Sequence, residues 1–198
     1  MIRRLTLVAM ILALAIPMSA SQFEELSFDQ IAREAKYVVR GHVLDTWSQW
    51  DDAREVIYTY ATVRVTRYFG ETTGPDVLMV REVGGTVDGY TMEAIGFPMI
   101  RRGEQIVAFL AEDGSDLRIH AFNQGKFLVR ERRGREVLIS DPVKQGDARR
   151  DMVASPRFEL RTEALDDATP ALGLDEFARM VEDARFGAGA PIVRNQQQ

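Results

Sequence analysis

The chain has 198 residues, with 25 lysines and arginines against 30 aspartates and glutamates, a formal net charge of −5 and no cysteine. A net negative charge repels nucleic acid phosphates and anionic lipid, so neither is expected as the main partner. The absence of cysteine excludes a disulfide framework and an acylated lipoprotein anchor, so the domain must rely on its hydrophobic core.

The first 20 residues have the layout of a cleavable secretion signal. A pair of arginines precedes an apolar run over 5–16, and a proline followed by small residues closes it. The run is 12 residues long, whereas a membrane-spanning helix needs about 20, so cleavage is favoured over anchoring. We expect 1–20 to be removed and the mature chain to begin near Ser21, in the periplasm or outside the cell.

The remaining pattern predicts one short helix followed by strands. Ser27 is a helix N-cap with Gln30 three residues later, which predicts a helix at 27–35. From residue 37 the apolar residues alternate with period two, as they do in β-strands. Eight strands are predicted, at 37–47, 55–69, 76–83, 86–95, 105–110, 117–121, 125–131 and 136–140.

Turn residues separate these strands at short intervals. Asp88-Gly89 and Arg133-Gly134 are typical of two-residue hairpins, and Glu112-Asp113-Gly114 of another turn. Eight short strands with such turns indicate an antiparallel barrel or sandwich rather than a parallel α/β sheet. The fold class expected is therefore mainly β, with Gly41 at a crowded or kinked strand position.

The last third of the chain has a different character. The β-barrel domain is expected to cover 21–140, and 141–173 lacks either period and is expected to be a linker. A helical pattern returns over 174–187, which predicts a C-terminal helix. Docking on the barrel is its plain interpretation, but the sequence does not determine whether the helix packs there. The remaining residues, 188–198, are expected to form a disordered tail.

Two stretches carry a resemblance to known barrels. The segment 35–43, AKYVVRGHV, is similar to the first strand of barrels related to the oligonucleotide/oligosaccharide-binding (OB) fold, especially the netrin-like domain of tissue inhibitors of metalloproteinases (TIMPs). The stretches 102–110 and 124–127 resemble the later half of uncharacterised bacterial exported proteins of this type. The resemblance covers about 28–140 and implies an OB-like or TIMP-like barrel with a short N-terminal helix.

The inhibitory chemistry of those relatives does not follow from the resemblance. TIMPs chelate the zinc of their target through an N-terminal, disulfide-held cysteine, and this chain has no cysteine. A fold can be shared without its function. The resemblance therefore supports the fold more than the activity.

No recognised catalytic or metal motif occurs in the chain. His42 and His120 are the only histidines, too few for a structural zinc site, and each is expected to have a structural role. The glycine pair within 83–86 precedes no helix, so a structural corner is favoured over a phosphate loop. No cofactor and no metal are expected.

Clusters of charged residues are interpreted as solvated surface, with a chemical or ligand-binding role as the alternative. The acidic pairs Asp51-Asp52 and Asp166-Asp167 lie in polar loops, so solvated surface is favoured over acid–base chemistry. Four arginines crowd one hairpin tip and favour solubility, with a sulfate, phosphate or uronate contact as the alternative. These are Arg130, Arg132, Arg133 and Arg135.

The strand at 55–69 provides the candidate binding residues. Its odd positions, beginning with Ile57, form a compact apolar core face. Period two places Tyr58, Tyr60, Arg64 and Tyr68 together on the opposite face, over roughly 33 Å. Tyrosine and arginine often dominate partner contacts, so these four are the predicted partner-binding residues. The competing interpretation is that the C-terminal helix or the linker covers them.

These observations favour an exported, non-enzymatic binding or interaction domain. The expected partner is a protein or an extended ligand. Neither nucleic acid nor, after signal cleavage, a membrane is expected as a partner. Two alternatives remain open, an inhibitor or accessory of a secreted protease and an enzyme of unrecognised type. A cleft with strongly shifted carboxyl or histidine pKa values would favour the enzyme, and an exposed tyrosine face would favour the binding domain.

Overall fold

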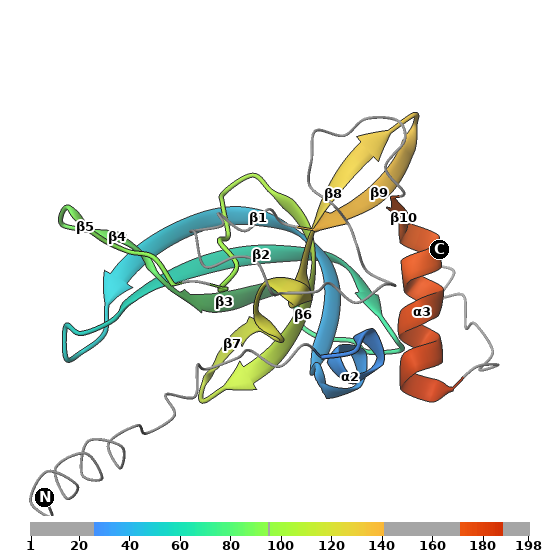
Figure 1. Cartoon of the computed structure of the whole chain (residues 1–198), viewed down its shortest axis with the longest axis horizontal. Coiled ribbons are helices and arrows are strands. Elements are labelled where there is room, and N and C mark those ends of the chain that lie inside the picture. Colours follow the sequence, from blue (N-terminus) through green and yellow to red (C-terminus); the bar gives the residue numbers. More distant parts are fainter. Residues whose placement is uncertain (1–25, 95, 141–170, 188–198) are drawn as a thin grey trace, which may run out of the picture.

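A computed structural model describes residues 26–94, 96–140 and 171–187 of the chain (Figure 1). The expected signal 1–20, residues 141–170 of the expected linker and the expected tail 188–198 lie outside this part. The described chain is mainly β, with two α-helices, one near its start and one at its end. The elements are α2 Phe28–Glu34, β1 Tyr37–Trp50, β2 Ile57–Phe69, β3 Val77–Val83, β4 Gly85–Val87, β5 Tyr90–Met92, β6 Gln105–Asp113, β7 Asp116–Ile119, the 3-10 turn η1 Phe122–Gly125, β8 Lys126–Arg132, β9 Arg135–Ser140, β10 Leu172–Gly173 and α3 Leu174–Phe186.

The predicted start of the first helix is confirmed. The Ser27 side chain accepts a hydrogen bond from the backbone N–H of Gln30, and the Gln30 side chain accepts one from the backbone N–H of Ser27. This reciprocal capping box satisfies two N–H groups that a helix start otherwise leaves unpaired. Leu26 packs against the core cluster that contains Ile31, as a hydrophobic staple requires.

Seven of the eight predicted strands are present with bounds shifted by a few residues. The continuous strand predicted at 86–95 is wrong, because Asp88-Gly89 folds this stretch into the separate β4–β5 hairpin. Asp88 has φ 50° and Gly89 has φ 81°, the left-handed pair that a type I′ hairpin turn needs. The short β10 lies within the expected linker and was not predicted, since two residues carry no period.

The sheet is mostly but not wholly antiparallel. Its strand order is β1-β2-β3-β7-β6-β8-β9-β10, and β6 also pairs with β1. The β3–β7 pairing is parallel and has one registered pair, Val80 with Leu117. This parallel pairing corrects the expectation of a purely antiparallel sheet. The pairing arises because β7 returns along β6 through the tight turn at Gly114.

Gly41 occupies the crowded position that the sequence predicts. The β1–β2 register shifts between Arg40 and Gly41, which marks a β-bulge. A Cβ atom on Gly41 would lie 2.5 Å from the Cγ1 atom of Val63 and 2.9 Å from the carbonyl oxygen of Arg64. Only a residue without a side chain allows β1 to approach β2 this closely.

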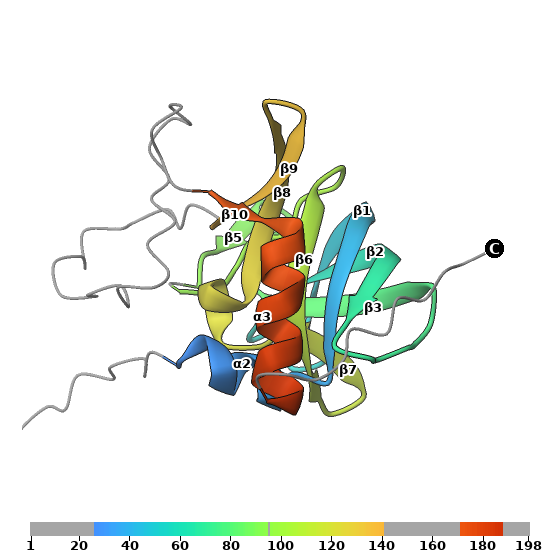
Figure 2. The same ribbon diagram turned by 90° about the vertical axis from the view of Figure 1, so that its right-hand side faces the viewer.

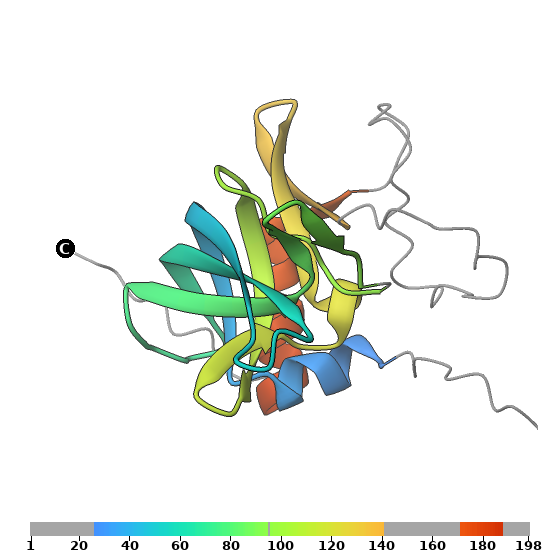
Figure 3. The same cartoon turned by 90° about the vertical axis from the view of Figure 1, so that its left-hand side faces the viewer.

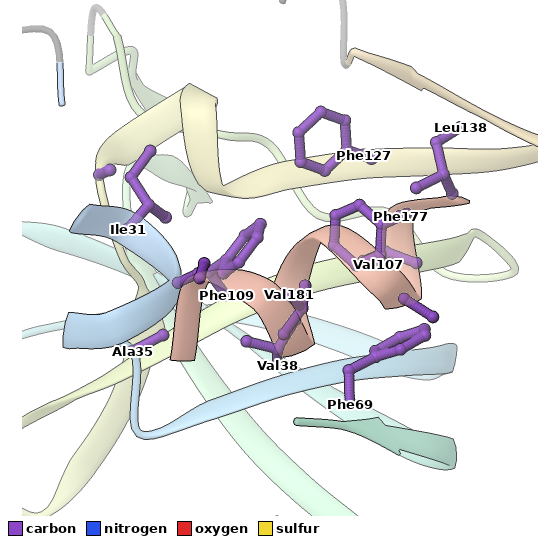
Figure 4. Packing of buried hydrophobic residues seen from close by; sticks show 14 of the residues in the cluster. Ile31, Ala35, Val38, Phe69, Val107, Phe109, Phe127, Leu138, Phe177 and Val181 are labelled. Carbon is purple, nitrogen blue, oxygen red and sulfur yellow. The ribbon is translucent and has the colours of Figure 1, made fainter. Parts of the chain in front are cut away.

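Helix α3 covers one side of the sheet and completes one of two core clusters. Phe177 is fully buried and contacts the rings of Phe28, Phe69, Phe109 and Phe127 edge-on, as Figure 4 shows for the last three. Figure 2 shows α3 in front of the strands with α2 beside its lower end. The second cluster lies between the strands themselves and contains Val39, Val63 and Ile106. The helix predicted at 174–187 is thus present and docked.

Candidate binding face

Strands β1, β2 and β3 present an outer face on which side chains align in rows across the three strands. The register pairs Tyr60 with Trp47 on one side and with Arg81 on the other. Directly paired residues point to the same face of a sheet, so each row is set by this register. We call this surface the outer face. Its rows are Gln49–Tyr58–Val83, Trp47–Tyr60–Arg81, Asp45–Thr62–Met79 and His42–Arg64–Val77.

The second row holds an aromatic pair and an arginine. The rings of Trp47 and Tyr60 stack with their centroids 5.5 Å apart and an interplanar angle of 11°. Trp47 is 40% exposed although it is a large hydrophobic side chain. The guanidinium of Arg81 lies 4.7 Å from the centroid of the Tyr58 ring, within cation–π distance. Two of the predicted tyrosines thus belong to one ordered cluster.

Arg81 is fixed in position by two carboxylates at the β6–β7 turn. Its guanidinium nitrogens lie 2.8 Å from the Asp116 carboxylate and 3.2 Å from the Asp113 carboxylate. Burial lowers the pKa of Arg81, but the hydrogen bond to Tyr60 and the two carboxylates together raise it by more than burial lowers it. The pKa of Arg81 therefore lies above its usual value. The arginine therefore remains charged and holds the aromatic side chains of β2 against β3.

Apolar side chains extend the outer face beyond this cluster. Met79 is 51% exposed and Val77 is 47% exposed, and both lie on β3 beside Thr62 and Arg64 of β2. Large apolar side chains at such exposure are unfavourable in water when they lie together. With Trp47 they give the outer face an apolar and aromatic centre with polar residues around it.

The four predicted residues do not form a single group. Tyr58 and Tyr60 are half-buried and Arg64 is exposed, all on the outer face. Tyr68 lies at the far end of β2, where its hydroxyl donates a hydrogen bond to the carbonyl oxygen of Pro75 at 2.7 Å and its ring contacts Tyr37. Burial raises the pKa of Tyr68, with further contributions from Tyr37 and Asp76. Its contacts are those of a structural residue that holds the β2–β3 loop.

Sequence reasoning missed Trp47, Arg81 and Met79. Each lies on a predicted strand. Arg81 and Met79 follow the alternation of β3, so the sequence could predict the face of β3 on which they lie. Trp47 could not be placed in this way, because the register shift between Val43 and Asp45 reverses the alternation of β1, and no local pattern reveals that shift.

The C-terminal helix does not cover the outer face in the described part of the chain. Its contacts with β2 lie at the end of that strand, where Phe177 packs on Phe69 and Arg185 lies beside Gly70. Figure 3 shows strands β2 and β3 in front and α3 behind them. Tyr58 contacts Arg81 and Tyr60 stacks on Trp47, whereas residues 141–170 of the expected linker lie outside the described part of the chain.

The remaining candidates differ in their surroundings. His42 is exposed on the outer face beside Arg64, whereas the Nε2 atom of His120 lies 3.1 Å from the Glu34 carboxylate on α2. Asp51 accepts hydrogen bonds from two backbone N–H groups of its own loop. Gly84 and Gly85 form the predicted corner between β3 and β4. Asp166-Asp167 lies outside the described residues.

Two ionisable side chains are buried, those of Glu82 and Lys126. Glu82 on β3 accepts a hydrogen bond from the backbone N–H of Ile119, and burial raises its pKa to about 8. Lys126 on β8 is fully buried and donates to the carbonyl oxygen of Met99 and, at 2.8 Å, to the Glu104 carboxylate. Glu82 and Lys126 each have hydrogen-bond partners in the protein. Across 26–94, 96–140 and 171–187, no group of three or more histidine, aspartate or glutamate side chains is placed to hold a metal ion.

A hollow on the described surface lies away from the outer face. Its volume is about 420 Å³, and Arg33, Gly70, Thr72 and Arg185 line it, where α2 and α3 end beside the β2–β3 loop. Arg185 donates to the carbonyl oxygens of Ala32 and Ala35 and to the Thr72 hydroxyl, and burial lowers its pKa. This arginine joins α3 to the end of α2.

No family model, curated protein or solved structure matches the chain. Among the helices of the described residues, none is long and apolar enough to cross a membrane.

Proposed function

We propose that the chain is an exported, non-enzymatic binding domain that uses the outer face of β1, β2 and β3 to hold a protein or an extended ligand. The observation that carries this proposal is the row Trp47–Tyr60–Arg81, flanked by the exposed Met79. Tryptophan, tyrosine, arginine and methionine are enriched at the centres of protein interfaces. Four such side chains aligned on one solvent-facing sheet favour a docking surface.

An OB-like barrel is part of the same proposal. The pairings run β1–β2, β2–β3, β3–β7, β7–β6 and β6–β1, with the β3–β7 pairing parallel. A ring of five paired strands supports a closed barrel, in which no strand of the ring has a free edge. In OB folds the face of the second and third strands binds ligands, which in this chain is the side of the outer face. The resemblance to TIMP-like domains rests on the sequence.

A matched set of variants tests the outer face. With the mature chain as bait, partners are captured from the exported fraction, and the affinity of a captured partner is then measured. We expect Arg64→Ala and Tyr60→Ala to weaken binding by about 2 kcal/mol or more, as truncation of a central contact does. Arg102→Ala and Tyr90→Ala replace the same residue types at exposed positions elsewhere and should bind as wild type does.

The melting temperature separates a binding role from a structural one. Arg64 is exposed, so its replacement should leave the melting temperature nearly unchanged, whereas Tyr60 packs on Trp47 and its loss should lower the melting temperature modestly. If Arg64→Ala and Tyr60→Ala both bind like wild type, the outer face is not the binding site. Export has its own test, since mass spectrometry of the exported protein should give an N-terminus near Ser21, and an intact Met1 on the functional form would contradict it.

A further inference from the structure

The second half of β1 has an unpaired side, the one that faces away from β2. Strand β6 pairs with β1 only over 37–42, and the loop before β6 bonds the backbone of Val43. The rest of β1, residues 44–50, pairs with β2 on one side and with no strand of the described chain on the other. We call this unpaired side of 44–50 the β1 edge. It borders the three strands that form the outer face (Figure 1).

The hydrogen-bond pattern shows which backbone groups the β1 edge presents. The Asp51 N–H donates to the carbonyl oxygen of Val56 at 2.8 Å, directly beyond Trp50, the last residue of β1 in register with β2. Bonded and non-bonded positions alternate along an antiparallel pair, so Trp50 is not bonded to β2. Thr46, Ser48 and Trp50 therefore direct their N–H and C=O groups away from β2. Within the described residues, none of these groups has a hydrogen-bond partner.

The β1 edge lacks the features that usually protect an unpaired strand. Free N–H and C=O groups in a row pair readily with another strand, and lysine, proline or a very short strand normally prevents this. Residues 44–50 contain neither lysine nor proline and carry one charge, on Asp45. The edge strand at the other end of the sheet, β10, has only two residues. The β1 edge is therefore suited to accept a further strand, whose backbone supplies the matching groups.

We propose that the strand it accepts is the β1 edge of a second copy of this chain, paired antiparallel about a two-fold axis at Trp47. In this register Thr46 of each copy exchanges backbone hydrogen bonds with Ser48 of the other, because both residues point away from β2. The same patch is used by both copies, so the contact closes on itself and the assembly stops at a dimer.

The side chains of the β1 edge are complementary to one another in this register. The two Trp47 side chains meet at a non-hydrogen-bonded position, where paired Cα atoms lie about 4.5 Å apart and side chains are closest. Asp45 lies opposite Gln49 of the second copy, so no like charges meet. An axis at Ser48 would instead place Asp45 opposite Asp51, and like charges directly opposite each other are destabilising. Charge and aromatic pairing therefore both favour the axis at Trp47.

The pairing joins the outer faces of the two copies. Directly paired residues lie on the same face of a sheet, so the row Trp47–Tyr60–Arg81 of one copy continues through the axis into the same row of the other. Trp47, which is exposed in the single chain, becomes covered by its counterpart. The dimer thus provides a partner for the exposed aromatic side chain as well as for the free backbone groups.

Sedimentation of the purified exported protein across the micromolar range tests the dimer, and charge changes at the exposed Gln49 test its register. Gln49→Lys should tighten the dimer and Gln49→Asp should weaken it, each by about threefold or more, because position 49 faces Asp45 of the other copy. Within one chain these positions are about 13 Å apart, further than the roughly 8 Å over which charges act at physiological salt. Both effects should therefore disappear in an Asp45→Asn background only if the contact joins two copies.

A proline substitution tests the backbone contact. Thr46→Pro removes an N–H group that points to the second copy and leaves the bonds between β1 and β2 in place, so it should give a monomer. Thr46→Val keeps the N–H group and should form the dimer as wild type does.

Three results would overturn the proposal. The first is a protein that stays monomeric at every concentration, and the second is a dimer that Thr46→Pro leaves unchanged. The third is an equal effect of Gln49→Lys with and without Asp45→Asn, since this would reflect net charge alone. All three are measurements of oligomeric state, so they do not depend on whether the outer face captures another partner.

Discussion

The carboxyl group of Glu82 on β3 accepts a hydrogen bond from the backbone N–H of Ile119 on β7, where these two parallel strands meet. The β3–β7 pairing has one registered pair, Val80 with Leu117, so this side chain supplies a contact that the backbone ladder does not. Burial raises the pKa of Glu82 to about 8, against the opposing effects of the Ile119 N–H group and Arg118. The group is therefore largely protonated at neutral pH.

This raised pKa makes stability depend on pH. Between pH 4.5 and about 8 the folded chain keeps a proton on Glu82 that the unfolded chain releases. Folding therefore loses stability as the pH rises through this window, by up to about 1.4 kcal/mol per pH unit from this group. We expect Glu82→Gln, which keeps the acceptor and cannot ionise, to unfold at higher denaturant than wild type at pH 8 and to show a flatter pH profile.

The control for this prediction is Glu93→Gln, which removes a carboxylate from an exposed position. Its denaturant midpoint should follow the wild-type profile across the same pH range. An unchanged profile for Glu82→Gln would mean that Glu82 does not carry the pH dependence.

The buried pair of Lys126 and Glu104 should be costly to break from one side. Replacing Lys126 with methionine leaves the poorly exposed Glu104 carboxylate without its 2.8 Å partner, and we expect a loss of about 3 kcal/mol in unfolding free energy. The double variant Lys126→Met/Glu104→Met removes both charges and should recover part of that loss. Denaturant unfolding of Lys126→Met, Glu104→Met and the double variant measures the coupling energy between the two side chains. A double variant less stable than Lys126→Met alone would contradict this account.

Helix α3 should be held to the sheet mainly by Phe177. Truncation of this fully buried ring leaves a cavity among four other phenylalanine rings, so Phe177→Ala should cost about 3–5 kcal/mol. Phe186, on the same helix and 48% exposed, provides the matched control, and Phe186→Ala should cost less than about 1 kcal/mol. Equal midpoints for the two variants in thermal or denaturant unfolding would show that α3 does not contribute to the core.

A side chain at Gly41 should be poorly tolerated. Gly41→Ser places a Cβ atom against Val63 and the Arg64 carbonyl, and we expect a loss of about 1–3 kcal/mol through overpacking. Gly173→Ser introduces the same atoms where no heavy atom lies within 4 Å, at the N-cap of α3, and should be neutral or slightly stabilising. Comparable losses in the two variants would mean that the close approach at Gly41 is not the cause.

Local features of the sequence were enough to predict the mainly β class, the capping box of α2, two of the hairpin turns and the crowding at Gly41. Each of these depends on residues close together in the chain, such as Ser27 with Gln30 or Asp88 with Gly89. Hydrophobic alternation also separated the buried positions of β2, such as Ala61 and Val63, from its outward positions.

Only the tertiary structure decided three further features. These are the parallel β3–β7 contact, the row Trp47–Tyr60–Arg81 and the separation of Tyr68 from the other tyrosines. Each depends on which residue of one strand lies opposite which residue of another. Alternation determines the face of a side chain within an unbroken strand, but the two register shifts between β1 and β2 change its neighbours across the sheet. The shift between Val43 and Asp45 also reverses the face on which the odd positions of β1 lie. Such shifts result from packing at Gly41 and along the strand pair, which involves residues more than 20 positions apart in the chain.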